Sequence, residues 1–230
     1  MVLRPAVRSI RGLGIALVGL LAAQVVVRLS QLVAIVMEMD LLHRDMRGAL
    51  VTGAQIRASN WRLSSSANVG DGILLVTAIV WLVWQHRAQK NLEGLGATWL
   101  RFTPGWAVGW WFVPFASLVK PFQTVRELWK ASGDPHGWQM RSTSPLLGWW
   151  WGLYLGAQAL IVIFAGVRDE AASDADLLAA DWWAIAALAV RIAAATVAAL
   201  LLWAVVTRQA DTRTAVPPRR DLATVPPRPA

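Results

Sequence analysis

The chain contains no cysteine and only three histidines. The absence of cysteine excludes disulfide bonds, thiolate catalysis and zinc or iron–sulfur sites built on thiolates. The histidines, His43, His86 and His136, are far apart, and none stands at metal-ligand spacing with a carboxylate or another histidine. None lies inside an apolar block, where an axial haem ligand would be needed. We therefore expect no metal site and no cofactor.

Other catalytic signatures are also missing. Ser64-Ser65-Ser66 lacks the surroundings of a nucleophile elbow, and the glycines of Gly94-Leu95-Gly96 do not follow a strand as a phosphate-binding loop would. No acid and base pair converges from the sequence pattern. We expect a protein that is not an enzyme.

The composition is that of an integral membrane protein. Hydrophobic residues make up 56% of the 230 positions and come in blocks, and there are 15 tryptophans against one tyrosine. Tryptophan favours the headgroup level of a bilayer, where its ring is half wet. The net charge of +8 comes from basic residues that flank the apolar blocks. That placement predicts membrane orientation and attraction to anionic lipid, and no nucleic-acid partner.

Four apolar blocks predict an all-α membrane protein with four transmembrane helices. The expected spans are residues 12–37, 66–84, 146–167 and 182–207 within a membrane domain over 12–207. A cleavable signal peptide is the alternative for the first block, but its apolar region continues past the Ala22-Ala23 cleavage candidate. Between the first two spans, Leu42 and Met46 begin a helical spacing that continues to Gly53 and predicts a short surface helix.

The two ends of the chain are basic. Residues 1–11 form a basic arm, and residues 208–230 form a tail rich in proline and arginine that contains VPPR twice. The tail has too little apolar content to pack, so disorder is expected, with a polyproline ligand as the alternative.

The stretch from Thr103 to Ser132 decides the topology. If Gly105 to Val119 crossed the membrane, the acidic loop 168–181 would face the cytoplasm and the basic tail would lie outside, against the usual Lys/Arg bias. The segment is also short, about 22 Å as a helix against a core of about 30 Å, and Pro114 kinks it. We therefore expect a re-entrant or interfacial element over 105–130, four crossings, and both termini in the cytoplasm.

The second limb of that element has an amphipathic pattern. Phe122, Val125, Leu128 and Trp129 share one helical face, and polar residues take the other. The pattern predicts a helix in the headgroup plane or, equally, one packed on the protein's own cytoplasmic parts.

Several motifs carry a family resemblance. They are the run from Trp84 through Arg87, Asn91-Leu92 and Gly96, then PGWAVGWWFVP, KPF, ELWKAS and LLGWWW. Over roughly Gly72 to Gly166 the chain resembles the actinobacterial family catalogued as domain of unknown function 4328, whose members often carry Asn where Ser117 stands. The resemblance implies a multi-helix bacterial membrane protein and no activity.

Three groups of residues are candidates for function. The first is a lipid- or anion-binding pocket about 21–26 Å from the cytoplasmic boundary, expected from Gln24, Arg28, Gln31, Asp71 and Arg191. The alternative is structural: the two arginines snorkel to the outer headgroups or pair with Asp71 and Glu38. The second is a GxxxGxxxG face of Gly148, Gly152 and Gly156, for packing within the monomer or for dimerisation.

The third group flanks the re-entrant element, and we name it the cytoplasmic mouth: His86, Arg87, Asn91, Lys120, Arg126 and Glu127. A re-entrant element needs a cavity or protein around it, which makes this mouth a candidate ligand site, although charges beside a membrane segment are common.

The function expected from these patterns is binding or scaffolding. The partners would be membrane lipid headgroups, a membrane-protein partner or further copies of the chain. The alternative is a small oligomeric transporter or channel that uses the re-entrant element and the intramembrane arginines.

Overall fold

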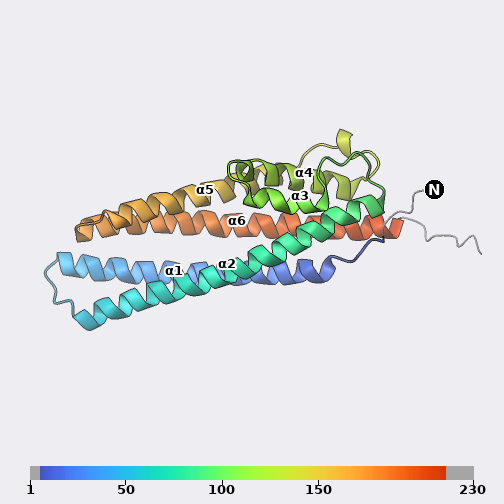
Figure 1. Ribbon diagram of the computed structural model, residues 1–230. Helices are drawn as coiled ribbons and strands as arrows, with labels where there is room; N and C mark the ends of the chain where they lie inside the picture. Colours follow the sequence, from blue (N-terminus) through green and yellow to red (C-terminus); the bar gives the residue numbers. More distant parts are fainter. Residues whose placement is uncertain (1–5, 216–230) are drawn as a thin grey trace, which may run out of the picture.

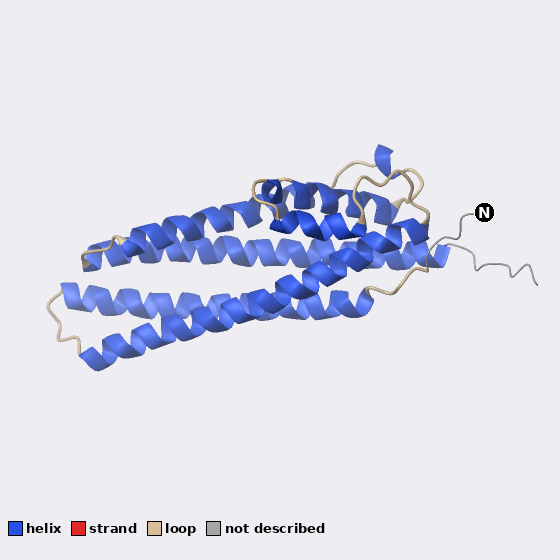
Figure 2. Ribbon diagram, in the orientation of Figure 1, coloured by secondary structure: helices blue, strands red, loops and turns tan. Residues whose placement is uncertain are grey.

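Four long helices form the body of the protein. The computed structural model describes residues 6–215, and within that range all regular structure is helical (Figure 2). The long helices are α1 (Arg11–Met46), α2 (Gly53–Leu95), α5 (Pro145–Asp169) and α6 (Asp174–Ala215). Each is long and apolar enough to cross a membrane, which confirms the predicted all-α membrane fold with four such helices.

The helices extend beyond the predicted spans. Residues 12–37, 66–84, 146–167 and 182–207 each lie inside one helix. The surface helix predicted around Leu42 to Gly53 is wrong, because Leu42 and Met46 belong to the end of α1 and Gly53 begins α2. The predicted tail is also partly wrong, because residues 208–215 continue α6. Its VPPR repeats lie outside the described residues.

Local chemistry explains where α2 begins and ends. Thr52 Oγ1 accepts a hydrogen bond from the backbone N–H of Gln55 at 3.3 Å, and Gln55 Oε1 accepts the N–H of Thr52 at 2.8 Å. This reciprocal capping box satisfies two N–H groups at the helix start. At the other end Gly96 has φ +98°, a left-handed conformation that glycine adopts without a Cβ penalty.

The long helices pack in the order α2, α1, α6, α5, with α1 and α6 in the middle. A hairpin fills the space between α2, α5 and α6 at the end of the bundle where the described termini lie (Figure 1). We call residues 104–133 the hairpin: α3 (Pro104–Gly109), the 3-10 turns η1 (Trp110–Phe112) and η2 (Ala116–Leu118), and α4 (Lys120–Gly133). A last 3-10 turn, η3 (Trp138–Met140), precedes α5.

The hairpin reverses direction at an exposed turn. Phe115 has φ +59° and is 86% exposed, and the Nε1 of Trp151 donates to the carbonyl of Leu118 at 3.0 Å. Trp151 lies six residues into α5, which places the turn about 9 Å along that helix from Pro145. Residues 105–119 therefore do not form a fifth long helix, and both ends of the hairpin return to the same end of the bundle.

The second limb of the hairpin is an amphipathic helix that packs on the bundle. Val125 and Leu128 are fully buried and Trp129 nearly so, and α4 lies against α2 and α6. Of the two alternatives for this face, the structure favours packing on the protein itself, because the apolar face is already covered.

Tryptophans form the centre of the larger core. Trp84 is fully buried on α2, and the rings of Trp81 and Trp150 stack with their centroids 5.7 Å apart. This stack joins α2 to α5 at the hairpin end. A smaller cluster of Ile35, Met39, Ala184 and Leu188 joins α1 to α6 at the opposite end.

We expect Trp84→Ala to lower the free energy of unfolding by about 3–5 kcal/mol, because it removes a fully buried ring from a close-packed core. The measurement is the thermal unfolding midpoint in detergent. The matched control is Trp149→Ala, whose ring is 67% exposed and should leave the midpoint nearly unchanged. Equal midpoints for both variants would contradict the position given to Trp84.

Candidate functional site

The residues predicted on α1 form a buried polar face against α2. Gln24, Arg28 and Gln31 are 8%, 4% and 7% exposed. Arg28 Nη1 donates to Gln31 Oε1 at 2.9 Å, Gln31 Nε2 donates to the carbonyl of Ser66 at 2.9 Å, and Gln24 Nε2 donates to Thr77 Oγ1 at 3.3 Å. The amides thus fix α2 beside a buried guanidinium.

A glycine lets α2 come this close. A Cβ added at Gly70 would lie 2.9 Å from Arg28 Nη1 and 3.2 Å from Gln31 Nε2. Real Cβ atoms almost never show a contact as short as 2.9 Å, so a side chain at this position would shift the end of the Arg28 side chain. Gly70 belongs to the site, although the sequence reasoning passed over it.

The other two predicted members lie around this face without pairing. Arg191 is half-buried on α6 and Asp71 is exposed on α2. Within the described residues, the ion pairs include none between Asp71 and either Arg28 or Arg191. Glu38 pairs with Arg168 instead, at 2.8 Å. The alternative in which Asp71 and Glu38 neutralise the two arginines by ion pairs is therefore wrong.

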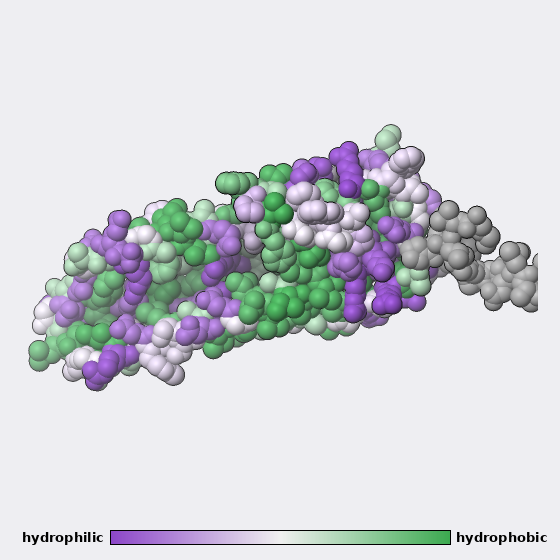
Figure 3. All heavy atoms as spheres, in the orientation of Figure 1, coloured by the Kyte–Doolittle hydropathy of each residue, from purple (hydrophilic) through white to green (hydrophobic). Residues whose placement is uncertain are grey.

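A recess lies between the two helix pairs. Figure 3 shows a hollow between the α1–α2 pair and the α5–α6 pair, with hydrophilic side chains along its rims, on the half of the molecule away from the described termini. Since α1 and α6 pack together in the middle of the bundle, they form the floor of this recess, and α2 and α5 form its walls. Arg28 and Arg191 come from the two floor helices.

The glycine face of α5 contacts no other part of the described chain. A Cβ added at Gly148, Gly152 or Gly156 would meet nothing within 4 Å. Packing within the monomer, the first of the two roles predicted for these glycines, is therefore wrong. The second role, contact with a helix of another chain, stays a prediction.

The residues of the cytoplasmic mouth surround the hairpin but do not converge on one ligand site. His86 Nδ1 lies 3.1 Å from the carbonyl of Pro104, and Arg87 is exposed. Lys120 Nζ lies over the ring of Trp110, 5.4 Å from its centroid. Arg126 and Glu127 line a hollow of about 530 Å³ between α4, the loop before the hairpin and the segment around η3.

Glu127 is the acceptor that fixes the loop before the hairpin. Its Oε2 accepts the backbone N–H of Arg101 at 2.7 Å, and its Oε1 accepts Gln89 Nε2 at 2.8 Å and the N–H of Phe102 at 3.3 Å. Burial raises the pKa of Glu127 above its usual range, and the Arg101 and Gln89 donors oppose that rise. The carboxylate therefore has a structural role, which is to hold the loop before the hairpin. The sequence had suggested only a candidate ligand-binding role for it.

Asn91 has a similar role between distant parts of the chain. Its Nδ2 donates to the carbonyl of Arg8 at 2.8 Å and to Gln209 Oε1 at 3.0 Å, while Gln209 Nε2 donates to Ser132 Oγ at 3.0 Å. These bonds join the start of the chain, α2, α4 and α6. The sequence predicted disorder for the tail that includes Gln209. The role of this amide could have been predicted only if α6 had been expected to continue past residue 207.

An ion cluster at the opposite end was also missed. Arg168 donates to Glu38 Oε1 at 2.8 Å and to Asp181 Oδ1 at 3.1 Å, and both carboxylates are buried. The cluster joins α5, α1 and α6. The sequence contained one indication of this cluster, because Arg168 is the single arginine at the start of an otherwise acidic loop.

We expect the stability of the protein to depend on pH through Glu127. Because the folded-state pKa is raised, the folded chain binds this proton more tightly, so stability is greatest below the ordinary carboxyl pKa and falls as pH rises through the raised value. Unfolding midpoints measured against pH should show this fall in the wild type, and Glu127→Gln should make it shallower, because the remainder comes from Asp181, whose pKa burial raises to about 7. The control Glu93→Gln, at an exposed carboxylate, should keep it. A fall as steep in Glu127→Gln as in the wild type would contradict the assignment.

Comparison with known proteins places this geometry in a family. A search of the curated proteins and a search of the solved structures each found no match. The family model described as Domain of unknown function (DUF4328) matches residues 47–207, a range that runs from the α1–α2 loop to the last turns of α6 and includes the hairpin. This match covers more than half of the chain, and the protein belongs to the DUF4328 family.

Proposed function

We propose that the protein is a non-enzymatic binding protein of the bacterial cytoplasmic membrane that holds the anionic headgroup of a lipid between Arg28 and Arg191. The observation that carries this proposal is a buried guanidinium, 4% exposed, whose hydrogen bond goes to the neutral amide of Gln31. A second arginine, Arg191, lies half-buried on α6, the helix that packs against α1.

Electrostatics supports an anion at this place. A charge taken out of water is costly unless an opposite charge accompanies it, and Arg28 and Arg191 form no ion pair within the described chain. Guanidinium groups bind phosphate oxygens in a bidentate manner, with geometry that an ammonium lacks. A phosphodiester would neutralise the excess charge, and Asp71, exposed nearby, would limit it to a singly charged ligand.

The recess suits a lipid. It lies between two helix pairs of a membrane protein, so its open side would face the acyl chains, and the two helices that form its floor are the ones that carry Arg28 and Arg191. An ionisable group inside a membrane marks a functional site by default. A lipid with its phosphate at Arg191 and its chains along α2 and α5 satisfies both the charge and the apolar walls.

We also propose the orientation of the bundle. The end with the described termini carries the basic segments and faces the cytoplasm, while the acidic loop around Asp169 and Asp174 faces outside. The hairpin then enters the inner leaflet and returns. Its turn exposes the apolar side chains of Phe112, Phe115, Leu118 and Val119, which is the composition expected of a turn immersed in lipid.

The transporter alternative finds less support in the geometry. The polar face around Arg28 and the buried amides at the hairpin end are separated by the packed rings of Trp81, Trp84 and Trp150. A pathway through one chain would have to displace these rings. A route between several copies, or a membrane-protein partner, is tested by the mass of the assembly in the experiment below.

We expect Arg191→Gln to reduce the amount of phosphatidylglycerol retained by the protein in mild detergent by about tenfold, because it removes one charged hydrogen-bonding partner of the phosphate. Native mass spectrometry measures the bound lipid and the oligomeric state together. The matched control is Arg57→Gln, which makes the same charge change at an exposed position near the same end. Unchanged retention in Arg191→Gln, with phosphatidylcholine bound as well as phosphatidylglycerol, would refute the site.

The absence of native cysteine allows a direct test of orientation. We expect Met140→Cys, 93% exposed before α5, to react with a membrane-impermeant maleimide only from the cytoplasmic side, and Leu50→Cys, 94% exposed between α1 and α2, only from outside. Phe115→Cys should stay unlabelled from both sides while the hairpin turn is in lipid. Labelling of Met140→Cys in intact cells would overturn the orientation, and labelling of Phe115→Cys would overturn the re-entrant hairpin.

A further inference from the structure

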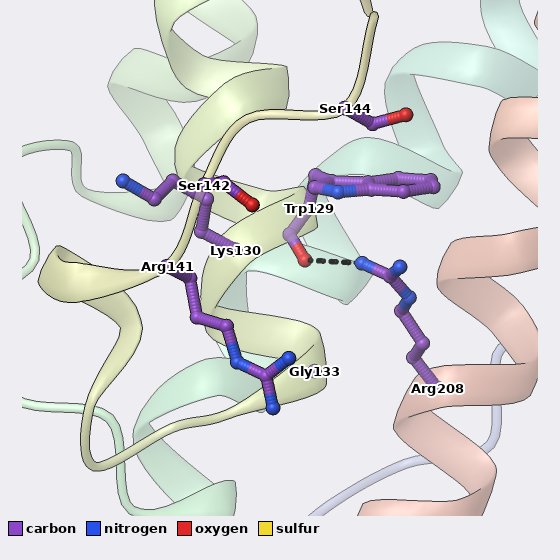
Figure 4. Close-up of a pocket in the computed structure, with 7 residues that line it drawn as sticks. All are labelled: Trp129, Lys130, Gly133, Arg141, Ser142, Ser144 and Arg208. Atoms are coloured by element: carbon purple, nitrogen blue, oxygen red, sulfur yellow. Dashed lines mark hydrogen bonds between the residues drawn. The ribbon is translucent and has the colours of Figure 1, made fainter. Parts of the chain in front are cut away.

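We propose that a second site, at the end of the bundle where the described termini lie, binds a phosphoryl group through Arg141 and Arg208. The site is a hollow of about 290 Å³ between the end of α4, the loop before α5 and the last part of α6 (Figure 4). It shares no residue with the recess, so it goes beyond the function proposed above, and only its place on the cytoplasmic side rests on the orientation proposed there.

Arg208 is held in place by Trp129. Its guanidinium carbon lies 3.7 Å from the centroid of the Trp129 ring, and its Nη1 donates to the carbonyl of the same residue at 3.3 Å. Stacking and hydrogen bonding fix the plane of the guanidinium before any ligand arrives. An arginine ordered in this way loses little freedom when it binds an anion.

Arg141 brings a second positive charge to the same hollow. Figure 4 shows its guanidinium and that of Arg208 on two sides of the space beside Gly133. The lining residues contain no carboxylate. The ion pair of Arg141 with Asp134, at 3.6 Å and exposed, is of the weak surface kind, so the positive charge of the hollow remains.

Hydroxyl groups and a helix start complete the site. Ser142 and Ser144 line the hollow, and Ser144 Oγ accepts the backbone N–H of Leu146 at the first turn of α5. The positive end of the α5 dipole therefore points to the same region. Lys130 also lines the hollow, but its Nζ already donates to the carbonyl of Gln139 at 3.2 Å. We therefore count only the aliphatic stem of Lys130 as part of the site.

The size and the depth of the hollow indicate the ligand. At about 290 Å³ it lies at the lower limit of ligand pockets, which suits a phosphoryl headgroup better than a larger ligand. Ser144 and Arg208 lie within two residues of the predicted spans 146–167 and 182–207, which would place the hollow at the level of the lipid phosphates. Basic pockets between transmembrane helices on the cytoplasmic side bind anionic lipid headgroups.

The test is photo-cross-linking of the full chain in nanodiscs with a photoactivatable phosphatidylglycerol whose reactive group is on the headgroup. We expect cross-linked peptides from residues 129–144, with yields about tenfold lower in Arg141→Gln and in Arg208→Gln. Arg87→Gln, exposed near the same end of the bundle, is the matched control and should keep the full yield. Arg141 is 61% exposed, so its substitution should leave the fold intact even if Arg208→Gln does not.

The source of the phosphoryl group is distinguished by competition. If added inorganic phosphate abolishes cross-linking at residues 129–144, the site takes a soluble phosphate compound, and if excess unlabelled phosphatidylglycerol alone abolishes it, the site takes a lipid. Either result supports phosphoryl binding. Equal yields in wild type, Arg141→Gln and Arg87→Gln would overturn the site. If cross-linked peptides come from residues 129–144 but none come from residues 24–31, the result refutes the recess and leaves this site standing.

Discussion

The side chain of Gln85 connects α2 to both limbs of the hairpin through hydrogen bonds on each of its polar atoms. Its Nε2 donates to the carbonyl of Ala107 and to Thr124 Oγ1, each at 3.0 Å, while its Oε1 accepts the indole N–H groups of Trp81 and Trp111. Backbone that is not helical is tolerated near a bilayer only where protein satisfies its polar groups. The hairpin meets this condition because a buried amide and the tryptophan rings are already in place on α2.

The same constraint divides the molecule into two ends of different chemistry. At the hairpin end, the Glu127 carboxylate and the amides of Asn91 and Gln209 bond to backbone and side chains on all their polar atoms, so these polar groups serve packing. At the opposite end, Arg168 is matched by two carboxylates, whereas Arg28 and Arg191, near the middle of α1 and α6, have no ion pair within the described chain. That contrast distinguishes a structural charge cluster from the recess that we propose as an anion site.

Much of the fold could be predicted from the sequence, because the hydropathy pattern alone requires four long helices. A block such as Leu146 to Val167 has no other way to satisfy its backbone in lipid, and it lies inside α5. The ends of the helices were harder to predict, since the charged residues after 207 are as compatible with helix as with coil. In the structure α6 continues to Ala215 because Gln209 and Thr212 bond to Ser132. The glycines of α5 matched a packing motif, but a motif does not state whether the neighbouring helix belongs to the same chain.

The sequence by itself determined the membrane class, the four long helices, the family and the placing of Gln24, Arg28 and Gln31 on one face, because these depend on local periodicity and composition. Only the tertiary structure decided which charges meet: Glu38 with Arg168, Asn91 with Gln209, and Arg141 beside Arg208 around one hollow. Side chains so distant along the chain become neighbours through the order in which the helices pack. That order depends on the summed fit of many buried surfaces, which no local pattern records.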